Sequence, residues 1–360
     1  MEKINIIHFV ETLDIGGLEN VVYNIVTGID PTRFNVAVVC RTSGGSTANR
    51  IRNSGIPVEV LHKEKLNILE LFRITQKLGR KKNSILHCHG LFALSSEAIM
   101  SIISGFQIIL VHVHNLETPE TLLQRLKLCL LKRCVNKFIP VSNMVQNALL
   151  QNFVSNTQTI HNGIDIDRFR FQSFPNKDLC GFSKDSFVLG MVGRIVKRKG
   201  FDHFIEIIAN IPTISGLIVG SGPYEENVRN MISENKLGNR IKCIPFQPQG
   251  KLPDIYSSLD ALFLFSEREG LPLSLLEAQS VGVPYFGNSA GGIGEVVKDG
   301  HNGFIIDKVD FLKIRDIINR IEENASYYRS NARKVVEEKY SLDKAIINIE
   351  KLYIESLAVH

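Results

Sequence analysis

The stretch Ser266–Glu295, SEREGLPLSLLEAQSVGVPYFGNSAGGIGE, decides the fold class. The residues just before it, DALFLF (260–265), form an apolar run that predicts a short buried strand. Pro272 stands where a helix is expected to begin, and Gly282 is expected to end it. A second apolar run at 283–286 predicts the next strand. Strand, loop, helix and strand in this order are typical of a parallel α/β sheet.

The two glutamates of this stretch indicate the kind of ligand. In an open α/β sheet, ligands bind at the carboxyl ends of the strands, and a helix N-terminus at that edge suits a phosphate. Glu269 lies in the loop before the predicted helix, and Glu277 lies on its second turn. Two carboxylates beside a phosphate can accept hydrogen bonds from hydroxyls, so the pattern indicates a nucleotide sugar. Glutamates at this spacing are also common on solvated helix faces, so the interpretation depends on further motifs.

A basic loop in the same half of the chain supplies matching cations. The segment FVLGMVGRIVKRKG (187–200) predicts a buried strand that ends in a basic turn. Gly193 at the strand end lets the backbone approach a ligand closely. Arg194 and Lys199 can hold a diphosphate through charge-assisted hydrogen bonds. A basic loop alone is usually solvated, but here it pairs with the acidic loop of the same predicted sheet.

The chain opens with another strand, loop and helix. KINIIHFV (3–10) predicts a buried strand, and residues 18–28 predict the helix that follows. Gly16 and Gly17 in the loop between them allow close approach of a ligand, although a tight turn without a ligand would need them too. The G-x-G-x-x-G fingerprint of dinucleotide-binding proteins is absent, which disfavours a nicotinamide-dependent oxidoreductase.

Histidines alternate along two later predicted strands of the first half. His87 and His89 belong to one strand, and His112 and His114 belong to the end of the next. His89 and His114 stand at strand ends, where a ligand is expected, whereas His87 is predicted to be a packed core residue. No further ligands at zinc-site spacing are evident, so no metal site is predicted.

In their order along the chain, these motifs resemble those of the family 4 retaining glycosyltransferases. The Gly-Gly loop, the strand-end histidine, HNGID (161–165), the GR…KG loop, EGLP with its second glutamate, and the Gly-Gly-x-x-Glu loop (291–295) span nearly the whole chain. The resemblance implies an α/β protein of the GT-B fold, with two Rossmann-like domains and a deep interdomain cleft. We expect residues 1–170 to form an acceptor domain, to which a helix at 342–357 returns, and residues 171–341 to form the donor domain.

The resemblance also implies roles for single residues. His114 would hydrogen-bond the donor sugar and support the charge that develops at the anomeric carbon, with His112 on the same strand face as the alternative. Arg194 and Lys199 would neutralise the leaving diphosphate. The expected catalytic residues are His114, Glu269, Arg194 and Lys199. The residues expected to bind the donor are Gly16, Gly17, Gly193, Arg194, Lys199, Gly222, Phe246, Glu269, Gly270, Leu271, Pro272 and Glu277.

Composition is typical of a soluble globular protein. The 360 residues are 44% hydrophobic and 22% charged, and such a length favours about two domains. The six cysteines are scattered without a CxxC pair, which indicates reduced thiols and a cytoplasmic protein. No apolar run approaches the ~18 residues of a transmembrane helix, and the first residues do not resemble a signal peptide.

Basic residues are concentrated in the first half. Lys and Arg outnumber Asp and Glu in residues 1–170, whereas the two classes are nearly balanced in residues 171–360. The segment TLLQRLKLCLLKRCVNK (121–137) predicts a helix with basic residues around an apolar stripe. Such a helix can lie on an anionic membrane surface, or it can pack its leucines on the sheet and leave its lysines in solvent.

The sequence therefore predicts a retaining, metal-independent glycosyltransferase. It would move a sugar from a nucleotide-sugar donor to an acceptor hydroxyl in polysaccharide or glycolipid synthesis. No cofactor and no nucleic-acid partner are expected, because the donor is itself a substrate. A polysaccharide, lipid-linked or other sugar acceptor and contact with the inner membrane face are the expected partners. The alternative is an inactive GT-B subunit that binds a nucleotide sugar without transferring it.

Overall fold

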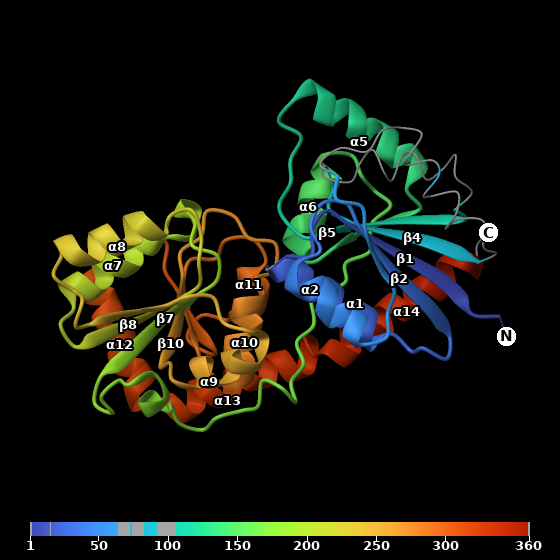
Figure 1. Ribbon diagram of the computed structural model, residues 1–360. Helices are drawn as coiled ribbons and strands as arrows, with labels where there is room; N and C mark the ends of the chain where they lie inside the picture. Colours follow the sequence, from blue (N-terminus) through green and yellow to red (C-terminus); the bar gives the residue numbers. More distant parts are fainter. Residues whose placement is uncertain (1, 15, 64–72, 74–82, 92–105, 359–360) are drawn as a thin grey trace. The chain divides into compact units, whose positions relative to one another are not determined.

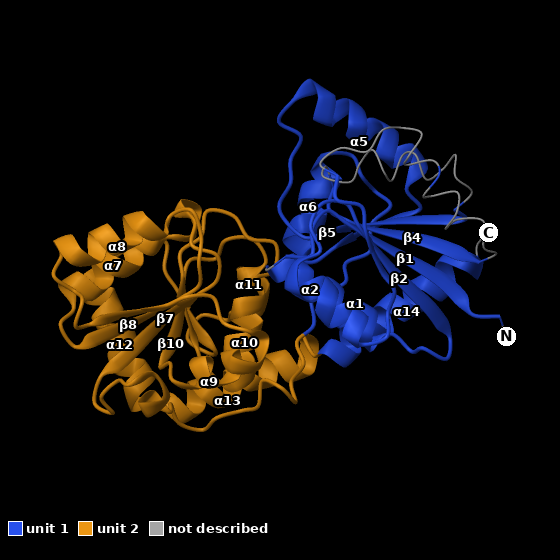
Figure 2. Cartoon of the chain, in the orientation of Figure 1, with its two compact units in different colours: residues 1–163, 342–360 blue, residues 164–341 orange. Residues whose placement is uncertain are grey.

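The chain divides into two compact units. The computed structural model describes residues 2–14, 16–63, 73, 83–91 and 106–358. Unit 1 comprises residues 1–163 and 342–360, and unit 2 comprises residues 164–341 (Figure 2). The division thus falls earlier than the boundary after residue 170 that the sequence suggests. The helices that the sequence predicts at 67–78 and 91–103 lie outside the described residues except for residues 73 and 91.

Unit 1 contains a six-stranded parallel sheet in the order β3-β2-β1-β4-β5-β6 (Figure 1). Its strands are β1 (Ile4–Val10), β2 (Phe34–Cys40), β3 (Val58–Val60), β4 (Ser84–His89), β5 (Ile108–Val113) and β6 (Lys137–Pro140). The helices described in this unit are α1 (Gly17–Gly28), α2 (Gly45–Asn53), α5 (Leu122–Cys134), α6 (Asn143–Gln151) and α14 (Leu342–Ala358).

Unit 2 repeats this topology. Its parallel sheet has the order β12-β11-β10-β7-β8-β9. Its strands are β7 (Phe187–Val192), β8 (Ile214–Val219), β9 (Ile241–Ile244), β10 (Ala261–Leu264), β11 (Tyr285–Gly287) and β12 (Gly303–Ile305). Its α-helices are α7 (Phe201–Asn210), α8 (Glu225–Glu234), α9 (Leu252–Ser257), α10 (Leu273–Val281), α11 (Ile293–Val296), α12 (Phe311–Glu323) and α13 (Ala325–Lys339).

Both sheets follow the strand order of a Rossmann fold, in which two strand–helix halves diverge from the central pair. The central strands of each sheet are buried on both faces, as a parallel sheet covered by helices requires. All six residues of β4, β5 and β7 are buried. This explains the apolar runs of β5 and β7, whereas β4 also buries Ser84, His87 and His89. The predicted α/β fold of two Rossmann-like domains is confirmed.

Helix α2, with the sequence GSTANRIRN, was not predicted from the sequence. It begins at two glycines and is largely polar, with only Thr47, Ala48 and Ile51 buried. A short helix of this kind lacks the apolar periodicity that makes a helix visible in a sequence.

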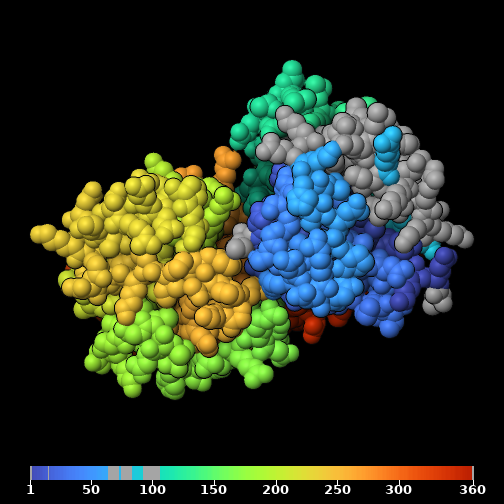
Figure 3. Space-filling model, in the orientation of Figure 1, coloured from blue at the N-terminus to red at the C-terminus, as the bar shows by residue number. Residues whose placement is uncertain are grey.

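Helix α5 shows an unusual distribution of leucines. The helix is shorter than the predicted 121–137, and it begins at a capping box in which Thr121 accepts from the backbone N–H of Gln124. It buries Leu128 and Leu131 but leaves four other leucines exposed: Leu122, Leu123, Leu126 and Leu130. Figure 3 shows the blue-green surface of α5 at the upper edge of the first unit.

Helix α14 completes unit 1 although it follows unit 2 in the chain. Gly28 of α1 permits its close approach, because a Cβ at this glycine would lie 2.9 Å from Ile346 Cγ1. The Glu350 carboxylate accepts from the Asp30 backbone N–H at 2.8 Å and lies 3.7 Å from the Arg33 guanidinium. The helix also buries Tyr353 completely.

The packing of α14 predicts a matched pair of substitutions. Ile349 is buried and the nearby Ile347 is 62% exposed. Ile349→Ala should lower the free energy of unfolding by about 2–5 kcal/mol, because it leaves a cavity under the helix. Ile347→Ala should change it by less than about 0.5 kcal/mol. Urea unfolding of both variants measures the difference, and equal losses would contradict this placement of α14.

Candidate donor-binding site

The predicted donor-binding loops of unit 2 follow the carboxyl ends of its strands. The basic loop follows β7, the Gly220–Gly222 loop follows β8, Phe246 follows β9 and the acidic loop follows β10. This is the edge at which open α/β sheets bind ligands. The parallel sheet therefore brings segments that are far apart in the chain to one edge.

The basic and acidic loops are joined directly by their backbones. The N–H of Glu267 donates to the carbonyl of Arg198 at 2.9 Å, and the Arg198 guanidinium donates to the carbonyl of Arg268 at 3.3 Å. Gly200 has φ +80°, and a Cβ there would lie 2.4 Å from the Phe265 carbonyl oxygen. Only glycine allows this contact without strain, so the two loops are held at a defined separation.

An ion pair links the side chains of the same two loops. Lys199 Nζ lies 3.3 Å from Glu269 Oε1, and both side chains are mostly buried. Ser266 donates from its hydroxyl to the same oxygen at 2.8 Å. Lys199 Nζ would also lie 3.4 Å from a Cβ at Gly193, so the ammonium stands beside the bare backbone of that glycine. The sequence analysis did not find Ser266, which lies three residues before Glu269 on the same loop.

Arg194 differs from Lys199 in its surroundings. Its side chain is exposed, and it has no ion pair or hydrogen bond in the part of the chain that the structure describes. The exposed guanidinium at the end of β7 keeps its full donor capacity for an anion. Lys197, on the same loop, is also exposed.

The glycines of these loops are needed for packing within the protein. A Cβ at Gly222 would lie 2.2 Å from the Ile195 carbonyl oxygen. The loop after β7 can therefore pack against Gly222 only because this residue has no side chain. Gly291 has φ +57°, and a Cβ there would lie 1.8 Å from the Glu269 carbonyl oxygen. The Gly292 N–H donates to the Gly270 carbonyl at 2.8 Å. The Gly-Gly-x-x-Glu segment therefore supports the loop that carries Glu269.

Glu277 lies on α10, a helix whose residues are almost all buried together with the preceding Gly270, Leu271 and Pro272. Its Oε2 accepts from the Tyr256 hydroxyl at 2.7 Å. Burial raises the pKa of the Glu277 carboxyl to about 7, against the smaller opposing effects of the Tyr256 hydrogen bond and the Arg168 charge. Tyr256 was not found from the sequence, because nothing in its local pattern points to a contact with Glu277.

Phe246 has a more open environment. The strand expected at 241–246 ends at Ile244, and Phe246 is 40% exposed at the same edge of the sheet. Its N–H donates to the Ser221 hydroxyl at 3.3 Å, which ties it to the loop after β8. An exposed aromatic face is available for stacking on a base.

The remaining predicted residues belong to unit 1. Gly16 has an extended backbone and precedes α1, and the Glu19 carboxylate lies where a Cβ at Gly16 would be, at 2.2 Å. Gly17 is the first residue of α1 and not a loop residue as predicted. A Cβ at Gly17 would have no neighbour within 4 Å, so Gly17 offers the open backbone that Gly16 lacks.

His114 follows β5 and is buried with four other histidines. His8, His87, His89, His112 and His114 form one stacked array in which the rings of His112 and His114 are 4.3 Å apart. Burial lowers the pKa of His114 to about 3. His112 and His114 lie in the same array, so both remain candidates for the histidine that contacts the donor sugar. The sequence analysis noted the alternation within each strand but not that the strands bring these residues together.

Two triplets of this array have the spacing of possible metal ligands. They are His8, His87 and His89, and His89, His112 and His114, whose ring nitrogens lie within 4.8 Å of one another. However, His8 Nδ1 and His89 Nε2 are only 2.9 Å apart and share a hydrogen bond, as do His89 Nδ1 and His114 Nε2 at 3.0 Å. A zinc ion would have to replace these hydrogen bonds with zinc–nitrogen bonds of ~2.0–2.1 Å. The array fits neutral, mutually hydrogen-bonded imidazoles better than a metal centre.

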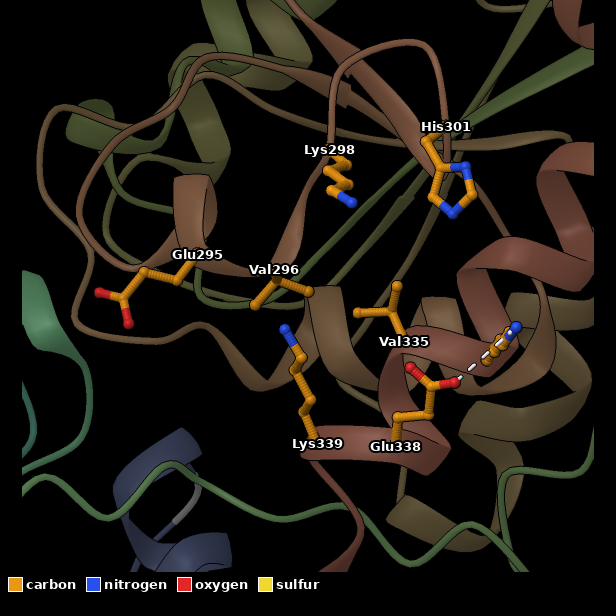
Figure 4. A pocket seen from close by; sticks show the side chains of 8 residues that line it. Glu295, Val296, Lys298, His301, Val335, Glu338 and Lys339 are labelled. Carbon is orange, nitrogen blue, oxygen red and sulfur yellow. Dashed lines mark ion pairs between the residues drawn. The ribbon is translucent and has the colours of Figure 1, made fainter.

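A hollow of about 210 Å³ in unit 2 lies away from these residues. It is lined by residues of α11, α13 and the segment between α11 and β12, including Glu295, Lys298 and His301 (Figure 4). In it, Lys334 Nζ lies 3.8 Å from Glu338 Oε1. None of the predicted site residues lines this hollow.

Comparison with known proteins agrees with this geometry. Residues 176–339 match the model of "Glycosyl transferases group 1", and residues 15–168 match that of "Glycosyltransferase Family 4". Each half of the chain therefore matches a glycosyltransferase model, and the protein is a glycosyltransferase. The first match includes both loops that carry the Lys199–Glu269 ion pair. The second includes Gly16, Gly17 and all histidines of the array except His8.

Relatives of this glycosyltransferase match between about three fifths and nearly all of its length. One is the "UDP-Gal:alpha-D-GlcNAc-diphosphoundecaprenol alpha-1,3-galactosyltransferase" of Escherichia coli, which is 24% identical over 98% of this chain and 97% of that protein. The Staphylococcus aureus "Capsular polysaccharide biosynthesis glycosyltransferase CapM" is 26% identical over 61% of this chain and 62% of its own. A solved structure of Anabaena Alr3699/HepE in complex with UDP has a TM-score of 0.84 at 22% identity, covering 98% of this chain and all of the other.

The shifted pKa of Glu277 predicts how stability varies with pH. The folded carboxyl titrates at about 7 and the ordinary value is 4.5, so the folded state holds a proton that the unfolded state has lost between these values. The protonated Glu277 carboxyl therefore contributes its full stabilisation of the folded state below pH 4.5. This stabilisation is lost as the pH rises to 7. Glu277→Gln should become more stable than the wild type by up to about 3 kcal/mol between pH 4.5 and pH 8.

Thermal or urea unfolding of the wild type and Glu277→Gln at several pH values tests this expectation. Glu226→Gln, at an exposed glutamate of α8, is the matched control and should show no such trend. A constant difference between wild type and Glu277→Gln across the pH range would show that this carboxyl is not shifted.

Proposed function

We propose that this protein is a retaining glycosyltransferase that moves a sugar from a nucleotide diphosphate to an acceptor hydroxyl. The observation that carries the proposal is the contact between the basic loop after β7 and the acidic loop after β10, closed by the Lys199–Glu269 ion pair at 3.3 Å. In this contact, the Lys199 ammonium would bind a phosphate, and the neighbouring Glu269 carboxylate would accept hydrogen bonds from sugar hydroxyls. A nucleotide sugar has both kinds of group next to each other.

The proposed reaction needs little covalent chemistry from the protein. The bond from the anomeric carbon to the diphosphate oxygen breaks, and the acceptor oxygen bonds to the same face of the sugar. The acceptor proton passes to the leaving diphosphate, so charge and atoms balance without a nucleophilic side chain. Arg194 and Lys199 would stabilise the departing diphosphate, which is electrostatic catalysis of the oxyanion type. These two cations support the further proposal that the enzyme needs no metal ion.

The relatives favour a uridine nucleotide and a lipid-linked or polysaccharide acceptor. The E. coli relative is named for UDP-galactose and a diphosphoundecaprenol acceptor, and HepE has been solved with UDP and with UDP-glucose. In this proposal the exposed ring of Phe246 would stack on the base, and Glu277 of α10 would hold the ribose diol. An inactive nucleotide-sugar-binding subunit is less well supported, because the named relatives are enzymes. Donor binding without turnover on any acceptor would favour it.

Substitution of Arg194 tests the role of the cations. Arg194→Ala should reduce kcat/KM by an amount equivalent to about 2–4 kcal/mol, because it removes a donor from charge that develops in the transition state. The midpoint of thermal unfolding should not change, since the side chain is exposed. Lys197→Ala removes an exposed cation of the same loop and is the matched control. Turnover of UDP-sugars by Arg194→Ala at the wild-type rate would remove Arg194 from this role.

We also propose that α5 binds an anionic membrane surface, where a lipid-linked acceptor would be found. Four of its leucines are between 47% and 74% exposed, and three of them recur every four residues, at 122, 126 and 130. Exposed apolar residues on one helix face are costly in water unless something covers them. The basic residues of the helix would face anionic headgroups: Arg125, Lys127, Lys132 and Arg133. None of the described helices is long and apolar enough to cross a membrane.

Sedimentation with vesicles tests the proposed surface. The wild type should bind phosphatidylglycerol vesicles better than phosphatidylcholine vesicles, and high salt should weaken this binding. Leu122→Ser/Leu126→Ser should reduce binding by roughly tenfold or more, because two buried leucines contribute about 1.5–3 kcal/mol each. Leu312→Ser, at a leucine of α12 that is 80% exposed, is the control. Equal binding of the double variant and the wild type would refute the membrane role of α5.

A further inference from the structure

The histidine array of unit 1 contains more histidines than the single one for which a role is expected. Five buried imidazoles lie on neighbouring strands of the sheet: His8 on β1, His87 and His89 on β4, His112 on β5 and His114 just after it. Their rings stack, with 4.4 Å between the centroids of His87 and His89. The resemblance to the family 4 glycosyltransferases implies a role for one of them, His114 or His112, and leaves the others unexplained.

One row of hydrogen bonds runs from His114 to helix α14. His114 Nε2 is 3.0 Å from His89 Nδ1, and His89 Nε2 is 2.9 Å from His8 Nδ1. His8 Nε2 is in turn 3.4 Å from the hydroxyl oxygen of Tyr353, the weakest link of the row. The free end of this row is His114 Nδ1, a buried atom without a hydrogen-bond partner among the described residues.

A second row starts from the same hydroxyl. The Tyr353 oxygen is 2.6 Å from His87 Nδ1, and His87 Nε2 is 3.2 Å from His112 Nδ1. The free end is His112 Nε2, which is likewise buried and unpaired in the described part of the chain. Tyr353 therefore lies at the centre of one continuous line that ends at His112 and His114.

Each hydrogen bond in this line contains one proton, which belongs to one of the two atoms that it joins. Burial lowers the pKa of all five histidines far below 6.5, so each ring is neutral near pH 7 and carries a single N–H. A ring that donates through one nitrogen must accept through the other. The direction of one hydrogen bond consequently sets the direction of all the others.

The shortest contact decides that direction. At 2.6 Å, the Tyr353–His87 contact is shorter than N–H donors usually give but lies within the range of hydroxyl donors. The tyrosine O–H therefore donates to His87 Nδ1. Its only proton is then used, so its contact with His8 must run from His8 Nε2–H to the tyrosine oxygen. His8 Nδ1 then accepts from His89, and His89 Nδ1 accepts from His114 Nε2–H.

We propose that Tyr353 is a positioning residue that selects the tautomer of His114, with Nε2 protonated and Nδ1 bare. His114 thus presents an acceptor, which can bind a hydroxyl of the donor sugar but cannot donate to it. The same line gives His112 a protonated Nε2, so the two candidate histidines present opposite hydrogen-bonding groups. The role towards the sugar rests on the proposed function, whereas the tautomer itself does not.

The tautomer can be read without any substrate. Long-range ¹H–¹⁵N NMR of the protein with ¹⁵N-labelled histidine distinguishes a protonated from a bare ring nitrogen, and loss of a signal in His114→Asn assigns it. The wild type should show His114 protonated at Nε2 only. Tyr353→Phe removes the hydroxyl and should give a mixture of both tautomers at His114. Tyr340→Phe deletes another buried hydroxyl, which donates to the Glu295 carbonyl, and should leave His114 unchanged.

Two NMR results would overturn the inference. One is a wild-type His114 protonated at Nδ1, and the other is an unaltered single tautomer in Tyr353→Phe. Stoichiometric zinc binding that is lost in His89→Ala would also overturn it, because the metal would occupy nitrogens of the line. If Tyr353→Phe unfolds, the wild-type spectrum alone still tests the assignment.

Kinetics link the tautomer to the reaction. If the wild type transfers sugar, Tyr353→Phe should lower kcat/KM roughly fivefold to tenfold, the effect of losing one well-formed hydrogen bond. Tyr340→Phe should keep the wild-type value. A wild type inactive with every nucleotide sugar would refute the proposed function but leave the NMR result standing. An active enzyme whose kcat/KM is unchanged in Tyr353→Phe would show that the tautomer does not serve the reaction.

Discussion

The ion pair between Lys199 and Glu269 is the constraint on which the proposed donor-binding loops of unit 2 depend. It joins two segments that the sheet brings to one edge, and backbone hydrogen bonds between the same loops hold them at a separation that the ion pair can span. Gly200 and Gly291 are necessary for this, since a side chain at either would displace the neighbouring loop. Polar groups that are already held in place do not have to reorganise when a charged ligand arrives, which is the physical basis of electrostatic catalysis.

The sequence predicts the strands and the loop chemistry well, because both are local properties. A parallel strand buried on both faces must be a continuous apolar run, and its end is marked by glycine and charge. The hydrogen-bond partners of buried polar groups, in contrast, cannot be predicted from the local sequence. Tyr256 donates to Glu277 across 21 residues, and the loop packing of Gly222 against Ile195 depends on two strands being neighbours. Such contacts follow from the topology of the folded sheet, and no local pattern contains them.

The histidine array shows the same limit more clearly. Alternation of His87 with His89 is visible in the sequence, and it shows that they share a face of their strand. Their contact with His8 follows only from the pairing of β1 with β4, in which His8 lies opposite His87. Tyr353 is 266 residues away from His87 in the chain. A reader of the sequence can find strand-end histidines, but the hydroxyl that orients them belongs to a helix that follows the other unit.

Helix α14 also imposes an order on the biogenesis of the protein. Residues 342–358 leave the ribosome after the whole of unit 2, yet their apolar face and Tyr353 are part of the core of unit 1. Unit 2 is continuous in the chain and can fold while translation proceeds. Until α14 is available, the part of the unit 1 core that α14 covers remains exposed. Nascent chains stalled before residue 342 would present that surface to chaperones and proteases.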